Sequence, residues 1–350
     1  STPEVRAWIE AQNALTFAYL EGLPARERFR ERLEELWDFP KRSAPFRRGE
    51  RYFQFRNSGL QNQDVLYAMN SPHDEGRALL DPNALSEDGT IALRNLAVSP
   101  DGRFLAYSTS ASGSDWQTWR VREVETGQDL PEALEHSKFS TATWLPDASG
   151  FFYSVYPAPR AGEAYTEANA DARLLLHRLG SAQAEDERVY ERPDEPQWMF
   201  GSAVSDDGKY LILTVSRSTE PKNLLFYREL GSSGAFLPLV SSWDAQVVFL
   251  GNDGERFYLR TDAGADRGRV VALELSDPQP TAWRDVVPET EDTLQAARLV
   301  GDTFACVYLA HASHRLRLVS TGGEARGEVA LPALGSLAEL NAEREHDELF

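Results

Sequence analysis

A polar turn followed by an aromatic and aliphatic run occurs six times in this chain and constrains its fold most. The clearest copy lies within Ala97–Trp116, where the turn SPDG (99–102) precedes the run Phe104–Thr109. Proline presets the turn dihedral, Asp bonds its own backbone and Gly supplies a positive φ. The run that follows is typical of a mostly buried strand. One such unit cannot bury its faces alone, so the copies are expected to pack on one another.

The marker glycines of the copies are regularly spaced. They fall at positions 49, 102, 150, 208, 254 and 301, in steps of 53, 48, 58, 46 and 47 residues. A period of this size, with several short strands per period, is typical of a β-propeller with one four-stranded sheet per repeat. A further copy begins near Asn341 and runs to Phe350. We therefore predict an all-β propeller over residues 38–350, with about six full blades and the start of a seventh.

Residues 1–37 differ from the repeats and predict two amphipathic α-helices. Ser1–Glu4 combines a hydroxyl cap, a first-turn proline and a carboxylate, which is typical of a helix start. Apolar residues then recur at helical spacing as far as Tyr19, the string EGLP (21–24) ends the helix, and a second helix runs through Trp37. Because a propeller core is built from sheets, the apolar faces of these helices require a partner that the blades do not supply.

Charge and composition exclude several classes of partner. The formal net charge of −19 argues against binding to nucleic acid or anionic membrane surfaces. No run of 18 apolar residues is present, so we expect no membrane span. The single cysteine, Cys306, favours a reducing compartment, and its strand-like setting predicts a buried apolar residue. The irregular segment Pro157–Ala172 is expected to be an exposed loop, and the polar segment Ser181–Asp186 is expected to be a loop at a blade rim.

The sequence shows no catalytic machinery of its own. It lacks the G-x-S-x-G string of serine hydrolases, and the nearest fragment, GSSG at 231–234, lies between predicted strands and indicates a β-turn. The six histidines have no metal-ligand spacing with cysteines or carboxylates. No glycine-rich phosphate loop lies between a strand and a helix. We therefore expect no catalytic residue, no metal and no cofactor in this chain.

Two aromatic segments are not needed for the predicted turns and strands. Trp198-Met199-Phe200 precedes the turn of the fourth repeat, and Phe139 lies shortly before Trp144. From the pattern alone, each segment belongs either to a blade core or to the lining of the central cavity.

Six longer strings of residues in this chain resemble those of a known protein family. They are AWIEAQN (7–13), FRNSGLQNQDVLY (55–67), LDPNALSEDGTIALR (80–94), SASGSDW (110–116), KFSTATW (138–144) and DEPQWM (194–199). Together they resemble the non-catalytic part of prolyl oligopeptidase, a family of cytosolic serine peptidases. The resemblance implies a seven-bladed propeller inserted between an N-terminal helical stretch and a C-terminal α/β-hydrolase domain. It also implies that residues 1–37 pack on that hydrolase domain and that the protein is cytoplasmic.

The resemblance implies a function as well. The family cleaves short peptides after proline with a Ser–Asp–His triad in the hydrolase domain, and the propeller excludes large folded substrates. This chain would then be an inactive fragment with a truncated seventh blade, and its partners would be that domain and short proline-containing peptides. The alternatives are a free-standing interaction propeller and a propeller-type glycosidase. The repeats lack the Gly-His and Trp-Asp dipeptides of the interaction class, and no motif places the paired carboxylates of a glycosidase.

Four positions carry the family's propeller-side contacts by motif. Phe139 in KFS, Met199 in QWM and Thr219 in RSTEP are expected to line the substrate cleft, although the family commonly has cysteine at the third position. Phenylalanine and methionine would give an adaptable apolar wall for a peptide side chain. Asp115 in GSDW is expected to pair with a substrate-site arginine of the hydrolase domain through a charge-assisted bond.

Overall fold

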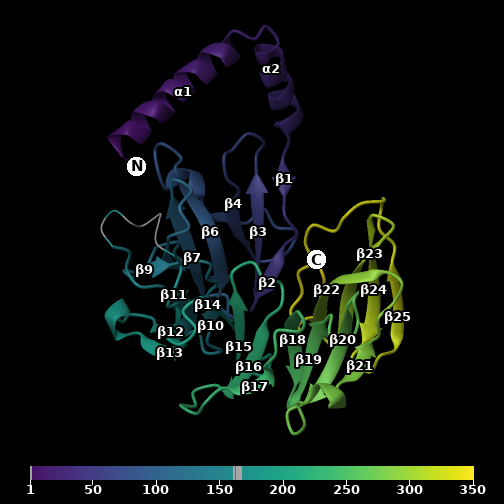
Figure 1. The fold of residues 1–350 in the computed structure, drawn as a ribbon. Coiled ribbons are helices and arrows are strands. Elements are labelled where there is room, and N and C mark those ends of the chain that lie inside the picture. Colours follow the sequence, from purple (N-terminus) through teal and green to yellow (C-terminus); the bar gives the residue numbers. More distant parts are fainter. Residues whose placement is uncertain (1, 161, 163–167) are drawn as a thin grey trace.

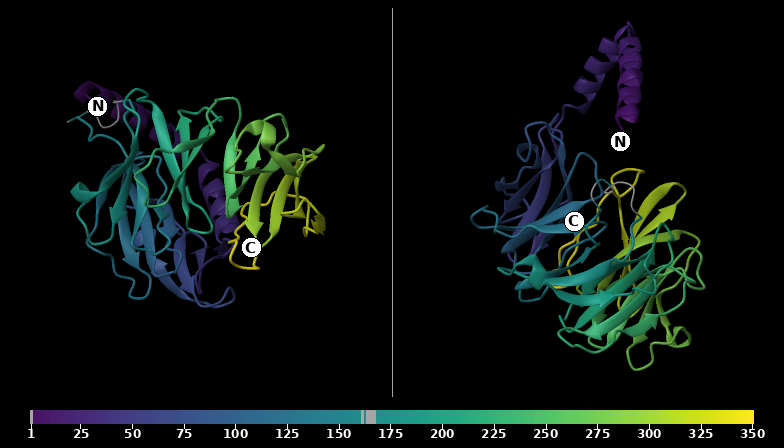
Figure 2. Two further views of the ribbon diagram at one scale, coloured as in Figure 1. Left: turned by 90° about the horizontal axis from the view of Figure 1, so that it is seen from below. Right: turned by 60° about the vertical axis from the view of Figure 1, so that its left-hand side comes forward.

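The protein consists of two helices and a ring of antiparallel sheets. A computed structural model describes residues 2–160, 162 and 168–350, and its ribbon shows the helices standing above one side of the ring (Figures 1 and 2). The expected loop Pro157–Ala172 includes residues 161 and 163–167, which lie outside the described residues. Within the described part, neither helix is long and apolar enough to cross a membrane.

The N-terminal helices form as the sequence predicts. They are α1 (Pro3–Glu21) and α2 (Arg26–Trp37), and the Thr2 hydroxyl caps the first by accepting a hydrogen bond from the backbone N–H of Val5 at 3.3 Å. Ser1 lies outside the described residues. Every residue of the two helices is described and none is buried, so their apolar side chains face solvent. The rings of Trp8 and Trp37 are 64% and 61% exposed.

The strands form six four-stranded blades within the described residues. Blade 1 contains β1 (Lys41–Arg42) and β2 (Phe46–Arg48), which share the inner position, then β3 (Arg51–Asn57), β4 (Val65–Met69) and β5 (Arg77–Leu80). Blade 2 contains β6 (Ile91–Val98), β7 (Phe104–Ala111), β8 (Gln117–Glu123) and β9 (Leu134–Ser137). Blade 3 contains β10 (Thr143–Trp144), β11 (Gly150–Val155), β12 (Arg173–Arg178) and β13 (Glu187–Glu191).

The remaining three blades follow the same order. Blade 4 contains β14 (Trp198–Val204), β15 (Tyr210–Arg217), β16 (Leu224–Glu229) and β17 (Leu237–Val240). Blade 5 contains β18 (Val247–Asp253), β19 (Arg256–Thr261), β20 (Arg269–Glu274) and β21 (Arg284–Val287). Blade 6 contains β22 (Thr293–Val300), β23 (Thr303–Ala310), β24 (Ser313–Ser320) and β25 (Ala325–Val329). In each blade successive strands pair antiparallel, and one extra bridge between Ser137 and Val155 joins blades 2 and 3.

Apolar cores between neighbouring blades stabilise the ring. Leu105 and Tyr107 of blade 2 pack against Phe53 and Leu66 of blade 1, and all four side chains are almost completely buried. Equivalent clusters lie between the later blades. The alternation of side chains along each strand lets one sheet pack on both neighbours, which explains why the apolar runs of the repeats are nearly continuous.

The predicted turns form at the inner corner of the blades. Gly102 adopts a φ of +73°, and the Asp101 carboxylate accepts a hydrogen bond from the backbone N–H of Arg103 at 3.0 Å. Blade 3 differs, because Ala148 takes the left-handed conformation there with a φ of +57°. Its glycine, Gly150, serves another purpose: a Cβ at this position would lie 2.1 Å from the carbonyl oxygen of His177. Close approach of two strands, and not a positive φ, requires glycine at that position.

The last ten residues form the hairpin that the sequence predicts as the opening of a further blade. Asn341 and Phe350 exchange two backbone hydrogen bonds of 2.8 and 2.9 Å, and Ala342 bridges to Leu349. The carbonyl of Arg344 accepts a hydrogen bond from the backbone N–H of Gly301 in blade 6 at 3.1 Å. The hairpin therefore lies against blade 6, and its side chains also contact blades 1, 4 and 5.

Candidate functional site

The two ends of the ring differ, and the direction of the strands defines them. The inner turns of blades 1 to 4 and the C-terminal hairpin meet around one cavity of about 520 Å³. The first strand of each of these blades ends at this mouth and therefore begins at the opposite end. Helix α2 joins β1 at that opposite end, where Lys41 pairs with Asn57 and its ammonium donates to the carbonyl of Gly59 at 2.7 Å. We call this opposite end the helix end (Figure 1).

All four residues singled out in the sequence lie at the helix end. Asp115 is in the connection between β7 and β8, and Phe139 is in the connection from blade 2 to blade 3. Met199 is the second residue of β14, and Thr219 follows the end of β15. These are the places where inner strands begin and second strands end. The topology thus brings residues from three blades, separated by up to 104 positions in the chain, to the same end of the ring.

Asp115 presents an exposed carboxylate. Its side chain is 53% exposed, and a guanidinium nitrogen of Arg94, on the inner strand of the same blade, lies 3.8 Å from a carboxylate oxygen. A contact of this length between two exposed groups contributes little to stability. The carboxylate can therefore accept a stronger, shorter bond from another cation.

Phe139 is held in an unusual backbone conformation. Its φ is +50°, a region that bulky residues avoid, and its ring is 52% exposed. The neighbouring Lys138 is buried, places its ammonium 3.9 Å from the ring centre of Trp116 and donates to the amide oxygen of Asn169 at 2.7 Å. This cation–π contact ties the loop of Phe139 to the loop of Asp115. Of the two interpretations left open by the sequence, burial in a blade core is wrong for Phe139.

The segment around Met199 has two faces, and the blade-core interpretation holds for Trp198 and Phe200. Trp198 and Phe200 are buried in the apolar core between blades 3 and 4, whereas Met199 points to the other face of β14 and is half-buried. Met199 pairs in register with Ser216 on β15. Thr219 is exposed two residues beyond the end of that strand. Met199 and Thr219 therefore both belong to the helix end of blade 4.

Sequence reasoning missed the lysine that organises this region. Lys138 lies next to Phe139 in the chain, but no spacing in the sequence links it to Trp116, because the contact arises from two separate connections. A buried lysine beside an aromatic residue becomes recognisable only when both loops are placed. The strained conformation of Ser218, with a φ of +47° immediately before Thr219, is likewise without a sequence signal.

The buried histidine of blade 3 is structural. His177 and Asp186 form a contact of 2.8 Å between Nδ1 and a carboxylate oxygen, and both side chains are fully buried. The other ring nitrogen, Nε2, has no hydrogen-bond partner among the described residues, and the imidazole packs on Phe151 with ring centres 5.6 Å apart. Among the described residues, no hydroxyl forms a hydrogen bond with either ring nitrogen of this histidine. Asp186 ends the polar connection predicted over Ser181–Asp186, but its own side chain turns into the blade interior.

Comparison with known proteins identifies the class of this propeller. The sequence profile described as "Prolyl oligopeptidase, N-terminal beta-propeller domain" matches residues 1–350. The chain therefore belongs to the prolyl oligopeptidase family, as its N-terminal propeller part. Prolyl endopeptidase of Elizabethkingia miricola is 30% identical over 347 residues, covering 99% of this chain and 49% of that protein. Prolyl oligopeptidase A of Galerina marginata is 31% identical over 381 residues, covering 100% of this chain and 51% of that protein.

Solved structures agree with this assignment. A prolyl endopeptidase studied for inter-domain dynamics superposes with a TM-score of 0.92 at 30% identity, over 99% of this chain and 51% of that one. Prolyl oligopeptidase B of Galerina marginata, bound to a 25mer macrocyclization substrate, gives a TM-score of 0.92 at 29% identity, over 100% of this chain and 52% of that one. The chain spans about half the length of the curated relatives it matches.

Proposed function

We propose that this chain is the substrate-gating propeller of a serine endopeptidase that cleaves short peptides after proline. Its helix end would face an α/β-hydrolase domain of the same enzyme. One observation carries the proposal: Asp115, Phe139, Met199 and Thr219 share the end of the ring at which two helices expose their apolar side chains. Relatives of twice the length, named prolyl endopeptidase and prolyl oligopeptidase, support it.

The four residues suit the proposed roles by their chemistry. Phe139 and Met199 offer an exposed ring and a flexible thioether, which can line an apolar pocket for a peptide side chain. Asp115 is exposed and can accept a bidentate bond from an arginine of the hydrolase domain. Thr219 has no thiol, so we propose that reagents directed at cysteine do not inhibit through this position.

The far mouth of the ring supports the exclusion of folded proteins. The C-terminal hairpin lies across it, and the Arg344 guanidinium reaches the carboxylates of Asp206 in blade 4 at 3.5 Å and Asp253 in blade 5 at 3.8 Å. Arg48 of blade 1 pairs with Glu343 of the same hairpin. These contacts hold several blades around a cavity of about 520 Å³, which is far smaller than a folded domain.

Hydrolysis by the chain alone is the first test. We expect the 350-residue chain neither to cleave a short chromogenic peptide with proline before the scissile bond nor to be labelled by a serine-directed covalent probe. Turnover accompanied by labelling would contradict the proposal, because it would place a nucleophile within this chain. The chain carries a single cysteine, and a thiol-directed probe serves as the specificity control.

Association with a hydrolase domain is the second test. The separately produced C-terminal half of the Elizabethkingia miricola enzyme should bind this chain in sedimentation experiments, and Asp115→Asn should weaken that binding about tenfold. Glu229→Gln is the matched control, since Glu229 is an exposed carboxylate at the opposite end of blade 4. Equal effects of both substitutions would remove the role of Asp115. Failure of the unaltered chain to bind would favour a free-standing interaction propeller.

Peptide kinetics in the reconstituted pair would test the cleft. Phe139→Ala and Met199→Ala should each raise KM for a short proline peptide several-fold, because each removes part of an apolar wall. Unchanged KM for both would contradict the assignment. We also propose a cytoplasmic location, which the single, buried cysteine supports.

A further inference from the structure

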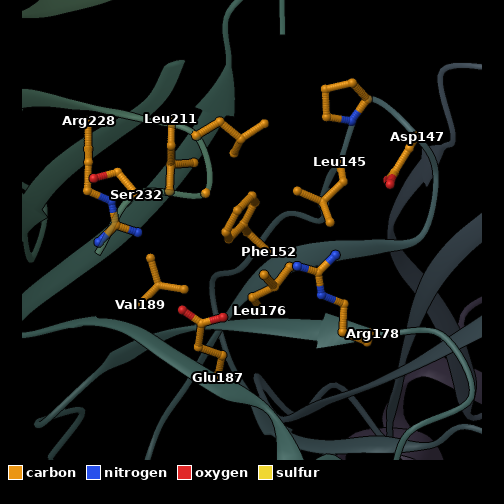
Figure 3. A pocket seen from close by; sticks show the side chains of 13 residues that line it. Leu145, Asp147, Phe152, Leu176, Arg178, Glu187, Val189, Leu211, Arg228 and Ser232 are labelled. Carbon is orange, nitrogen blue, oxygen red and sulfur yellow. The ribbon is translucent and has the colours of Figure 1, made fainter. Parts of the chain in front are cut away.

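An apolar groove opens between blades 3 and 4 at the end of the ring opposite the helix end. Its volume is about 400 Å³, and its walls include the inner turn of blade 3 and the turn that follows β16 (Figure 3). Leu145, Phe152, Leu176 and Leu211 form the apolar surface and belong to the core between the two blades. The groove is thus an open margin of an interblade core, distant in topology from the four residues of the helix end.

A basic side chain occupies the same repeat position in three consecutive blades. Arg122 pairs in register with Leu105, the second residue of β7. His177 pairs with Phe151, the second residue of β11, and Arg228 pairs with Leu211, the second residue of β15. In each blade the apolar partner packs on the preceding blade, so the basic side chain faces that blade as well.

In blades 2 and 3 this basic side chain has a carboxylate partner from its own blade. Arg122 donates to both oxygens of Asp129 at 2.7 and 3.0 Å. His177 contacts Asp186 at 2.8 Å. Each carboxylate precedes the fourth strand of its blade and therefore comes from the same connection.

Blade 4 has a basic side chain at this position, Arg228, but it lacks the carboxylate and tyrosine partners found in blades 2 and 3. The carboxylates of blades 2 and 3 also accept hydrogen bonds from Tyr107 and Tyr153, and Leu213 stands at this position in blade 4. The connection 230–236, which replaces those that carry the carboxylates, contains no acidic residue. Among the described residues, Arg228 has no carboxylate within 4 Å.

The surroundings of Arg228 leave its charge without a counterion. The guanidinium stacks on Phe236 at 4.5 Å, and one terminal nitrogen donates to the carbonyl of Gly234 at 3.4 Å. Its Nε is buried and has no hydrogen-bond partner among the described residues. Burial lowers the pKa of Arg228, since the charged form is poorly solvated there, while the negative charge of Glu187, which also lines the groove, opposes that shift. A partly buried cation of this kind is stabilised by an anion.

We propose that this groove binds a small carboxylate with an apolar tail. The ligand's carboxylate would pair with Arg228 as Asp129 and Asp186 pair with the equivalent basic side chains of blades 2 and 3. Its tail would lie on the leucines and Phe152. Arg178 borders the groove as a second cation and donates to the hydroxyl of Ser149 at 3.1 Å. A volume of about 400 Å³ suits a small molecule.

The charges facing the groove fix the sign of the proposed interaction. Arg178 and Arg228 attract an anion, whereas Glu187 on the blade 3 wall repels it (Figure 3). Asp147 also lines the groove, but its carboxylate accepts hydrogen bonds from the N–H and hydroxyl of Ser149 at 3.0 and 2.7 Å. If a carboxylate binds in the groove, neutralising an arginine should therefore weaken its binding, and neutralising Glu187 should strengthen it.

Calorimetric titration of the 350-residue chain tests the proposal with two probes. Decanoate represents fatty acids, and N-acetyl-leucine represents peptides that end in an apolar residue. The probe that binds with the higher affinity identifies the class of ligand. Arg228→Gln should weaken its binding about tenfold, because a charge-assisted bond is lost. Arg217→Gln is the matched control and should leave the affinity unchanged, since Arg217 stacks on Trp243 at the same 4.5 Å at the other end of the same blade.

A second variant keeps the test decisive if the first one disturbs folding. Glu187 is exposed, and Glu187→Gln should tighten carboxylate binding about threefold by removing the facing negative charge. Decanol, which lacks the charge, should bind equally to the unaltered chain and to Glu187→Gln. Absence of binding by both probes would overturn the proposal. Weaker binding by Glu187→Gln, or equal binding by Arg228→Gln and the unaltered chain, would overturn it as well.

Discussion

The hydroxyl of Tyr52 in blade 1 lies 2.8 Å from both carboxylate oxygens of Glu348, 296 positions later in the chain. Arg47 of the same blade reaches one of those oxygens at 2.9 Å. The ring of Phe350 meets the ring of Tyr52 edge-on, with centres 6.1 Å apart. Side chains, and no strand pairing in the described residues, therefore connect the C-terminal hairpin to blade 1.

Removing this carboxylate should loosen the contact between the two ends of the ring. Glu348→Gln is expected to lower the free energy of unfolding by about 1 kcal/mol, because two partly exposed charged hydrogen bonds are weakened. Thermal unfolding followed by circular dichroism measures the change. Glu50→Gln is the control, since Glu50 contacts the same Arg47 at 3.5 Å but is 94% exposed. A loss no larger than that of the control would show that Glu348 does not hold the ring ends together.

The same contact should depend on pH. Hydrogen bonds from Tyr52 and then Arg47 lower the pKa of Glu348 below its ordinary value of 4.5. A lowered pKa in the folded state means that the contact contributes fully above pH 4.5 and is lost as pH falls through the lowered value. The difference in melting temperature between the unaltered chain and Glu348→Gln should thus be constant from pH 7 to 5 and should narrow towards pH 3. A difference that widens on acidification would contradict this sign.

The repeat architecture could be predicted from local chemistry. Turns such as that at Gly102 require residues that few other positions need, so six copies reveal a period before any contact is known. The helix start at Thr2 and the buried setting of Cys306 follow from equally local patterns. The strand predicted over Phe104–Thr109 is β7 (Phe104–Ala111), whose start is fixed by the polar turn before it.

Contacts between connections could not be predicted in the same way. Asp186 lies in a polar segment that the sequence predicts as a loop at a blade rim, yet its side chain turns inward and contacts His177 of the preceding strand. Phe139 looks like a core residue by its aromatic neighbours, but a left-handed backbone places its ring in solvent. Both outcomes depend on how separate connections meet, and a single sequence carries no periodic signal for that.

The thiol of Cys306 should be almost inert in the folded chain. It is fully buried in the core between blades 5 and 6, and burial raises its pKa to about 12 from the ordinary value of 9.0. The thiolate fraction at pH 8 is then about a thousandfold lower than for a free thiol. Alkylation by iodoacetamide should follow global unfolding and accelerate steeply in urea. Rapid labelling without denaturant would show that blade 6 opens locally.

The buried carboxylate of blade 3 should matter more to stability than its counterpart in blade 2. Asp186→Ala leaves the Nδ1 of His177 and the hydroxyl of Tyr153 without their carboxylate partner in a fully buried place. We expect a loss of about 3–5 kcal/mol in the free energy of unfolding.

Asp129→Ala is the matched control for that substitution, because Asp129 holds the same repeat position but is 33% exposed beside Arg122. Water can solvate the arginine left behind, so the expected loss is about 1–2 kcal/mol. Urea unfolding of both variants, compared at equal m-values, gives the two free energies. Equal losses would mean that burial does not set the strength of this repeated contact. Equal losses would also weaken the proposal that the groove beside Arg228 binds a carboxylate, because that proposal compares Arg228 with the paired side chains of blades 2 and 3.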